Sequence, residues 1–141
     1  MRNWLLIGAI LILAGCVTPK PPPYDPAWSR DCEHFRDQAV CFELRDSILN
    51  ADARRKIGEV AAYLKANPVA AVQIEGHADD LRTEEDNREL GETRAQVVRE
   101  ELVRSGIAAE RIDTISYGQD ELPVAKKYPR CAEFVLLTPP Q

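Results

Sequence analysis

The sequence lacks the excess of basic residues that binding to nucleic acid usually requires. It contains 18 lysines and arginines against 23 aspartates and glutamates, which gives a formal net charge of −5 at pH 7. Nonspecific affinity for nucleic acid comes largely from lysine and arginine side chains that neutralise phosphates. The sequence also contains no G-x-S-x-G motif, the setting of the nucleophilic serine in α/β-hydrolases. These absences argue against a nucleic-acid-binding protein and against that class of hydrolase.

The apolar run near the start of the sequence is too short to cross a membrane as a helix. It extends from Trp4 to Leu13, whereas a spanning helix needs about 20 residues. Arg2 precedes the run and small residues follow it. A basic residue before an apolar stretch of about 7–15 residues is typical of a signal peptide. We therefore expect residues 1–15 to be a cleaved signal peptide.

The four residues Leu13-Ala14-Gly15-Cys16 resemble the lipobox of bacterial lipoproteins. The resemblance implies cleavage before Cys16, lipid on its thiol and acylation of the new N-terminus, and several acyl chains on one residue anchor a protein stably. The alternative is an ordinary secretory leader followed by a chance cysteine. Residue 17 is valine and not the aspartate that often retains such lipoproteins in the inner membrane, which favours the outer membrane. Residues 16–28 are rich in proline, which predicts an extended linker.

Three further cysteines follow, at Cys32, Cys41 and Cys131. Cysteines of exported proteins form disulfides in an oxidising compartment, so three of them predict one disulfide and one free thiol. The sequence does not select the pair. Neither histidine stands at finger-like spacing from these cysteines, so we expect no zinc site and no other cofactor.

Hydrophobic periodicity predicts four strands and two helices in the folded part, which we assign to residues 29–141. The strands are expected at 40–44, 69–75, 112–117 and 132–137. One helix is expected between a cap at Asn50 or Asp52 and a stop at Asn67-Pro68, and the other at 86–105. The order βαβαββ predicts an α+β domain with the helices packed on one face of a mixed four-stranded sheet.

Two motifs carry a resemblance to a known family. They are Gly76-His77-Ala78-Asp79, at the end of a predicted strand, and N-x-x-L-G-x-x-R-A from Asn87 to Ala95, in a predicted helix. They resemble the OmpA-like family, and within it the peptidoglycan-associated lipoproteins, and the likeness covers roughly residues 39 to 137. It implies the OmpA-like fold and noncovalent binding of peptidoglycan without catalysis.

By this resemblance, Asp79 and Arg94 are the expected ligand-binding residues. Stem peptides of most Gram-negative walls contain meso-diaminopimelate, whose free end carries an ammonium and a carboxylate on one carbon. Asp79 would take the ammonium, and Arg94 would hold the carboxylate by a bidentate, charge-assisted pair. Backbone N–H groups near the helix start would add partial positive charge. The alternative interpretation is a structural Asp79–Arg94 salt bridge.

Three more residues belong to the expected binding site: His77, Leu90 and Arg130. We expect His77 to belong to the structural turn, with a hydrogen-bonding role beside the ligand. A cation held by His77, Asp79 and Asp80 would need a further ligand that the spacing does not supply.

Acidic residues at Glu84, Glu85 and Asp86 have two interpretations. Paired carboxylates are the catalytic groups of glycoside hydrolases, some of which digest cell walls. Acidic residues are also favourable at the start of a helix, where they interact with its dipole. We favour the helix start and expect no enzyme.

The sequence departs from the family pattern at three places. Many members have Asn-Arg-Arg before the last strand, where this chain has Pro129-Arg130-Cys131, so Arg130 remains for the ligand carboxylate and Cys131 replaces the second arginine. Leu44-Arg45 stands where Phe-Asp is common. Arg82 stands where glycine is common, and a positive φ there would strain an arginine.

Taken together, these features predict an outer-membrane lipoprotein of a Gram-negative bacterium. Its domain would face the periplasm and tether the outer membrane to the wall. The alternative is an accessory lipoprotein of an envelope complex, such as a Tol–Pal-like or secretion system, that acts mainly through protein contacts.

Overall fold

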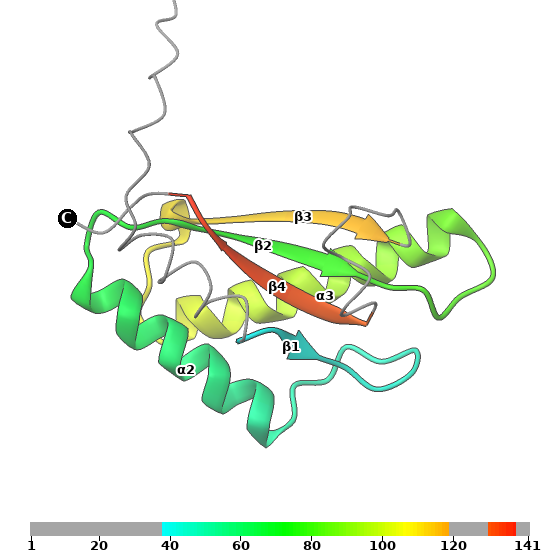
Figure 1. Cartoon of the computed structure of the whole chain (residues 1–141), viewed down its shortest axis with the longest axis horizontal. Coiled ribbons are helices and arrows are strands. Elements are labelled where there is room, and N and C mark those ends of the chain that lie inside the picture. The colour runs from blue at the N-terminus through cyan, green and yellow to red at the C-terminus, as the bar shows by residue number, and fades with distance from the viewer. Residues whose placement is uncertain (1–37, 119–129, 138–141) are drawn as a thin grey trace, which may run out of the picture.

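The chain forms an α+β domain in which two helices pack on a mixed four-stranded sheet (Figure 1). The computed structural model describes residues 38–118 and 130–137. The predicted signal peptide, the proline-rich linker, Cys16 and Cys32 therefore lie outside the described residues. Within the described ranges, no helix is both long enough and apolar enough to cross a membrane.

The order of elements confirms the predicted βαβαββ arrangement, with one added 3₁₀ turn. The elements are β1 (Val40–Cys41), α2 (Ala51–Ala66), β2 (Val72–His77), α3 (Glu84–Arg104), η1 (Ala109–Arg111), β3 (Ile112–Gly118) and β4 (Cys131–Leu136). The strands lie in the order β1-β4-β2-β3. β2 and β3 are parallel, whereas β4 is antiparallel to both of its neighbours, β1 and β2. The sheet is therefore mixed, as the sequence predicts.

Side-chain caps determine where both helices begin. The Asn50 side chain accepts a hydrogen bond from the Ala53 N–H at 2.8 Å, so Asn50 is the cap of α2. Thr83 accepts from the Asp86 N–H at 3.0 Å and caps α3, which begins at Glu84, two residues before the predicted start. Glu84, Glu85 and Asp86 occupy the first turn of α3, where acidic side chains stabilise the helix dipole.

Both helices bury their apolar stripes against one face of the sheet, in a single hydrophobic core. The apolar stripe of α2 is buried, and Ile57 and Leu64 in it have no exposed surface. α3 contributes Ala95, Val98 and Leu102, which are equally buried. The facing strand residues are Val72, Ile74, Ala132, Phe134 and Leu136. Burial of each large apolar side chain contributes roughly 1.5–3 kcal/mol, so this core holds the helices on the sheet.

Each strand differs from its prediction in at least one boundary, and the largest differences are at the end of β1 and the start of β2. The predicted strand at 40–44 ends at Cys41, because the chain turns after Phe42, where the Asp46 N–H donates to the Glu43 carbonyl at 3.1 Å. β2 begins at Val72 and not at residue 69, because a turn in which the Ala70 N–H donates to the Asn67 carbonyl occupies the preceding residues. The early end of β1 matters for the site, because the carbonyl groups of the segment that follows β1 point towards α3.

A disulfide joins Cys41 of β1 to Cys131 of β4. The two cysteines are directly opposite each other in the antiparallel register, with their Cα atoms 4.0 Å apart. The described residues thus contain one disulfide, as the sequence predicts, and its pair is one that the sequence leaves open. The bond connects residues 90 positions apart, so it closes a long loop of the unfolded chain.

We expect the double variant Cys41→Ala/Cys131→Ala to lose about 2–4 kcal/mol of unfolding free energy, since the cross-link restricts the unfolded chain. Urea denaturation measures the loss. Reduction of the wild-type chain should lower its stability by a similar amount, while the double variant should not respond to the reductant. A double variant as stable as the oxidised wild type would contradict the prediction.

Candidate functional site

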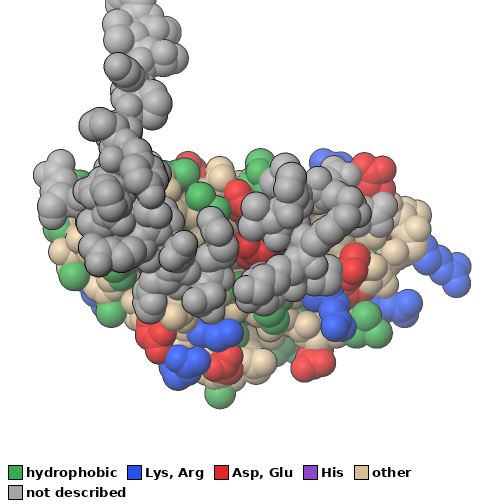
Figure 2. All heavy atoms as spheres, viewed as in Figure 1, with side chains coloured by type: hydrophobic (Ala, Val, Ile, Leu, Met, Phe, Trp, Pro, Cys, Tyr) green, Lys and Arg blue, Asp and Glu red, His purple; other side chains and the backbone are tan. Residues whose placement is uncertain are grey.

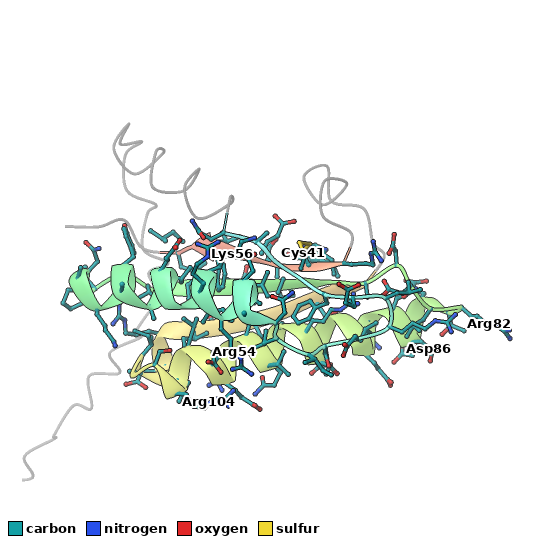
Figure 3. The ribbon with its side chains drawn as sticks, turned by 90° about the horizontal axis from the view of Figure 1, so that it is seen from below. Cys41, Arg54, Lys56, Arg82, Asp86 and Arg104 are labelled. Carbon is teal, nitrogen blue, oxygen red and sulfur yellow. A yellow bond between two sulfur atoms is a disulfide. The ribbon has the colours of Figure 1, made fainter. Side chains whose placement is uncertain are left out.

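The candidate site lies where β2 ends and the chain turns towards α3. His77 is the last residue of β2, and the next N–H, that of Ala78, donates to the Gly118 carbonyl of β3 at 3.0 Å. Asp79 and Asp80 follow, and the loop ends at the cap of α3. Arg82 extends from this loop into solvent at one end of the molecule (Figure 3). Among the described non-glycine residues only Arg45 has a positive φ, of 58°, so Arg82 does not carry the strain considered above.

A buried asparagine fixes this loop to α3. Asn87 has no exposed surface. Its side-chain oxygen accepts from the Leu81 N–H at 2.9 Å, and its amide group donates to the Leu81 carbonyl at 3.3 Å. The asparagine of the N-x-x-L motif therefore binds the loop that carries Asp79 and Asp80. The motif identifies this residue in the sequence, but its contact with the loop is visible only in the structure.

Arg94 lies at the centre of the site and is completely buried. Its Nε donates to the Asp46 carbonyl at 2.9 Å, Nη1 to the His77 carbonyl at 3.0 Å, and Nη2 to the Glu43 carbonyl at 3.1 Å. Nη2 also pairs with the Asp80 carboxylate at 2.8 Å. Arg94 thus connects α3 to the end of β2 and to the turn after β1.

The Arg94 guanidinium also lies over an aromatic ring. Its central carbon is 5.3 Å from the centre of the Phe42 ring, and a guanidinium at that distance gains a cation–π attraction. Phe42 itself is buried. The ring and the four hydrogen bonds together leave the guanidinium enclosed.

Asp80, and not Asp79, is the partner of Arg94. The side chains of Asp80 and Arg94 are both 0% exposed. Asp80 Oδ2 also accepts from the Arg45 N–H at 2.7 Å, and Oδ1 accepts from the Asp79 N–H at 3.2 Å. Burial opposes ionisation of Asp80, but the hydrogen bonds from Arg94 and from the Arg45 backbone outweigh it and lower the pKa of this carboxyl. The salt bridge that the sequence suggested for Asp79 is therefore made by its neighbour.

Asp79 remains exposed at the surface, next to this internal pair. Partial burial raises the pKa of its carboxyl, and the hydrogen bond and negative charge of Asp80 raise it further. The charge of Arg130 acts in the opposite direction. Arg130 is exposed and immediately precedes β4, whose Ala132 pairs with Gly76 of β2. The sheet register thus brings an exposed carboxylate and an exposed guanidinium to the same edge.

His77 and Leu90 flank the site without being exposed at its rim. The His77 ring is stacked on Tyr117 with ring centres 5.7 Å apart, and Nε2 lies 4.0 Å from the Glu133 carboxylate. Burial lowers the pKa of His77, which favours the neutral ring. Its backbone carbonyl is the group that contacts Arg94. Leu90 is half-buried, one helical turn before Arg94 on α3.

The described residues contain no cluster of histidine, cysteine, aspartate and glutamate that could hold a metal ion. Acidic and basic side chains are interspersed over the visible part of the face in Figure 2, without a large field of one sign.

Comparison with known proteins agrees with this geometry. The model of the OmpA family matches residues 41–133. A peptidoglycan-associated lipoprotein of Haemophilus influenzae is 43% identical over 131 residues, which cover 86% of this chain and 84% of that protein. One from Brucella melitensis biotype 1 is 35% identical over 127 residues, which cover 82% of this chain and 75% of the other.

Solved structures show the same fold. The crystal structure of the peptidoglycan-associated lipoprotein from Burkholderia pseudomallei superimposes with a TM-score of 0.63 at 25% identity, over 70% of this chain and 88% of that chain. The C-terminal domain of Helicobacter pylori MotB superimposes with a TM-score of 0.59 at 24% identity, over 71% of this chain and 84% of that chain. The second likeness concerns the fold alone.

Proposed function

Because this chain belongs to the OmpA family, and its relatives of that family include peptidoglycan-associated lipoproteins, we propose that it is an envelope lipoprotein that binds peptidoglycan. The observation that supports the proposal best is the arrangement at the end of β2. There an exposed carboxylate, Asp79, lies at the same sheet edge as an exposed guanidinium, Arg130, above the buried Arg94.

The ligand that fits these charges is the free end of meso-diaminopimelate in a stem peptide. Asp79 takes the ammonium group, since its carboxylate is exposed at the rim. Arg94 takes the carboxylate by a charge-assisted pair, and Arg130 adds positive charge beside it. His77 and Leu90 are the remaining residues of the proposed site: the carbonyl of His77 holds Arg94, and Leu90 lies one helical turn before Arg94 on α3.

Binding to the wall and insertion in a membrane together would make the protein a tether. Lipid on Cys16 would anchor the chain in the outer membrane, with the domain facing the periplasm. The relatives of this chain are peptidoglycan-associated lipoproteins, so we propose a binding module and not an enzyme.

One observation favours a second function, that of an accessory lipoprotein of an envelope complex such as a Tol–Pal-like or secretion system. Cys131 replaces the second arginine that many family members have before the last strand, and its sulfur is bonded to Cys41. The positive charge available to a ligand carboxylate is therefore smaller. A weaker wall site would leave protein contacts as the main activity.

Calorimetry of the full chain in detergent, with a stem peptide that ends in meso-diaminopimelate, tests the main proposal. We expect Asp79→Asn to weaken binding by at least about ten-fold, equivalent to about 1.4 kcal/mol, because the ligand ammonium loses its anionic partner. The fold should be retained, since the Asp79 side chain is exposed.

Asp113→Asn is the matched control. It removes the same charge from an exposed position at the start of β3, and should bind like the wild type. Equal affinities for the wild type and Asp79→Asn would contradict the assignment of Asp79. No binding by the folded wild type would favour the second function.

A further inference from the structure

We propose that the Asp80 carboxylate is a built-in competitor of the ligand: it occupies the place on Arg94 that a ligand carboxylate takes, and leaves it when the ligand binds. This inference rests on the proposed function and adds a residue that sets the affinity of the same site. The family motifs do not include Asp80, and the sequence gives it no role in the ligand contact.

The contacts of Arg94 show which partner can be exchanged. Three of its acceptors are backbone carbonyls, those of Glu43, Asp46 and His77, and they cannot leave without moving the chain itself. The fourth acceptor is the Asp80 side chain at 2.8 Å, which can rotate away about its own bonds. Exchange at this one position would leave the other three hydrogen bonds of Arg94 in place.

Exchange of one carboxylate for another preserves the charge of the interior. Arg94 and Asp80 are both 0% exposed, and a buried guanidinium that loses its only anionic partner is strongly unfavourable. A neutral ligand group could not replace Asp80 without that cost. The site should therefore select ligands with a free carboxylate.

Asp80 would have a new partner once it leaves Arg94. Its backbone follows Asp79 directly, and Asp79 is exposed at the rim, where the ligand ammonium is proposed to bind. The released carboxylate would add a second negative charge beside that ammonium. A ligand with an ammonium and a carboxylate on one carbon would thus supply a carboxylate to Arg94 and an ammonium to Asp80, the two groups that the exchange separates.

The turn after β1 would relax in the same step. Asp80 Oδ2 accepts from the Arg45 N–H at 2.7 Å, and Arg45 has the left-handed backbone that non-glycine residues rarely adopt. Release of Asp80 removes the hydrogen bond that holds this N–H in place. Ligand binding should consequently change the environment of residue 45, although that residue need not touch the ligand.

Asp80→Asn tests the proposal, because the amide has the same shape but no negative charge to compete for Arg94. We expect the full-length variant in detergent to bind the stem peptide at least about ten-fold more tightly than the wild type, since the ligand supplies a charged acceptor in place of a neutral one. A second stem peptide, with the terminal diaminopimelate carboxylate amidated, should bind the variant no more tightly than it binds the wild type. Asp113→Asn is again the charge-matched control.

The outcomes separate the inference from the proposed function. A wild-type chain that binds neither peptide contradicts both. A wild type that binds, with an Asp80→Asn variant that binds equally or more weakly, overturns the competitor and leaves the wall ligand in place.

Nuclear magnetic resonance of the wild type gives a second test that does not require the variant to fold. With saturating stem peptide, the carbon signal of the Asp80 carboxyl and the Nε–H signal of Arg94 should both shift, and the amidated peptide should leave them in place. Unchanged Asp80 and Arg94 signals in the saturated complex would overturn the proposal.

Discussion

Arg94→Ala is expected to lower the free energy of unfolding by about 3–5 kcal/mol, because it leaves the buried Asp80 carboxylate without its partner. Three backbone carbonyls, of Glu43, Asp46 and His77, lose their donor in the same variant. Urea denaturation of the purified chain measures the loss.

Arg104→Ala is the control on the same helix. Arg104 is exposed and pairs only at the surface, with Glu101 at 2.8 Å, so its removal should change the stability by less than about 1 kcal/mol. A double variant, Arg94→Met with Asp80→Leu, should lose less than Arg94→Ala alone, because no unpaired charge remains inside. Equal stability of Arg94→Ala and the wild type would contradict the assignment of Arg94 as a structural centre.

This prediction affects how binding experiments are interpreted. Loss of wall binding in Arg94→Ala can follow from collapse of the site as well as from loss of a ligand contact. Asp79→Asn and Asp80→Asn are more informative, since they change charge at the rim and at the exchangeable position while the Arg94 hydrogen bonds to backbone carbonyls are retained.

Gly76→Ala is expected to destabilise the fold by about 3 kcal/mol or more, because the new methyl group has no space. A Cβ at Gly76 would collide with the carbonyl oxygen of Gly91 and lie 3.2 Å from the Ala95 Cβ. The first obstacle is backbone, which cannot rotate aside. β2 and α3 touch here through two glycines, and the contact places Arg94 beneath the end of the strand.

Gly58→Ala is the matched control, since a Cβ at this exposed position of α2 meets nothing within 4 Å. Alanine in a helix interior is favoured over glycine by about 0.5–1 kcal/mol, so this variant should be more stable than the wild type. Thermal unfolding of both variants compares the two effects. If Gly76→Ala had the same melting temperature as the wild type, β2 and α3 could move apart without loss of stability, and the prediction would be wrong.

The fold could be predicted from the sequence because its elements have regular patterns. Hydrophobic periodicity, a cap at Asn50 and a stop at Asn67-Pro68 predict a helix whose ends agree with those of α2. β1 was predicted too long, since Phe42 and Leu44 continue the alternation of the strand while the backbone already turns. The alternation of apolar residues indicates which side chains face the core. It does not indicate that the Glu43 and Asp46 carbonyl groups accept hydrogen bonds from Arg94.

The sequence predicts which residues lie near the end of β2, but it does not predict how they contact one another. Asp79 and Arg94 were identified by family resemblance, and both lie at the end of β2. The partner of Arg94 was missed, because adjacent aspartates at 79 and 80 are equivalent in sequence. Only the path of the turn after His77 makes one of them exposed and buries the side chain of the other.

The choice of the disulfide pair likewise depends on the three-dimensional path of the chain. Parity among Cys32, Cys41 and Cys131 predicts one bond, but the choice requires the register between β1 and β4. That register is formed by residues about 90 positions apart, and no local pattern encodes it.

The Cys41–Cys131 bond also determines how mechanical load would pass through a tether. A pull on the chain before Cys41 enters the domain at β1, which pairs with β4 at only two positions, Val40 with Ala132 and Cys41 with Cys131. Hydrogen bonds of so short a strand would open one after the other under tension. The disulfide instead transmits the force to β4 covalently, one residue from Arg130 at the rim of the proposed wall site. Helix α2 lies in the loop that the bond closes and away from this line of force, so tension on the tether would not act on α2 directly.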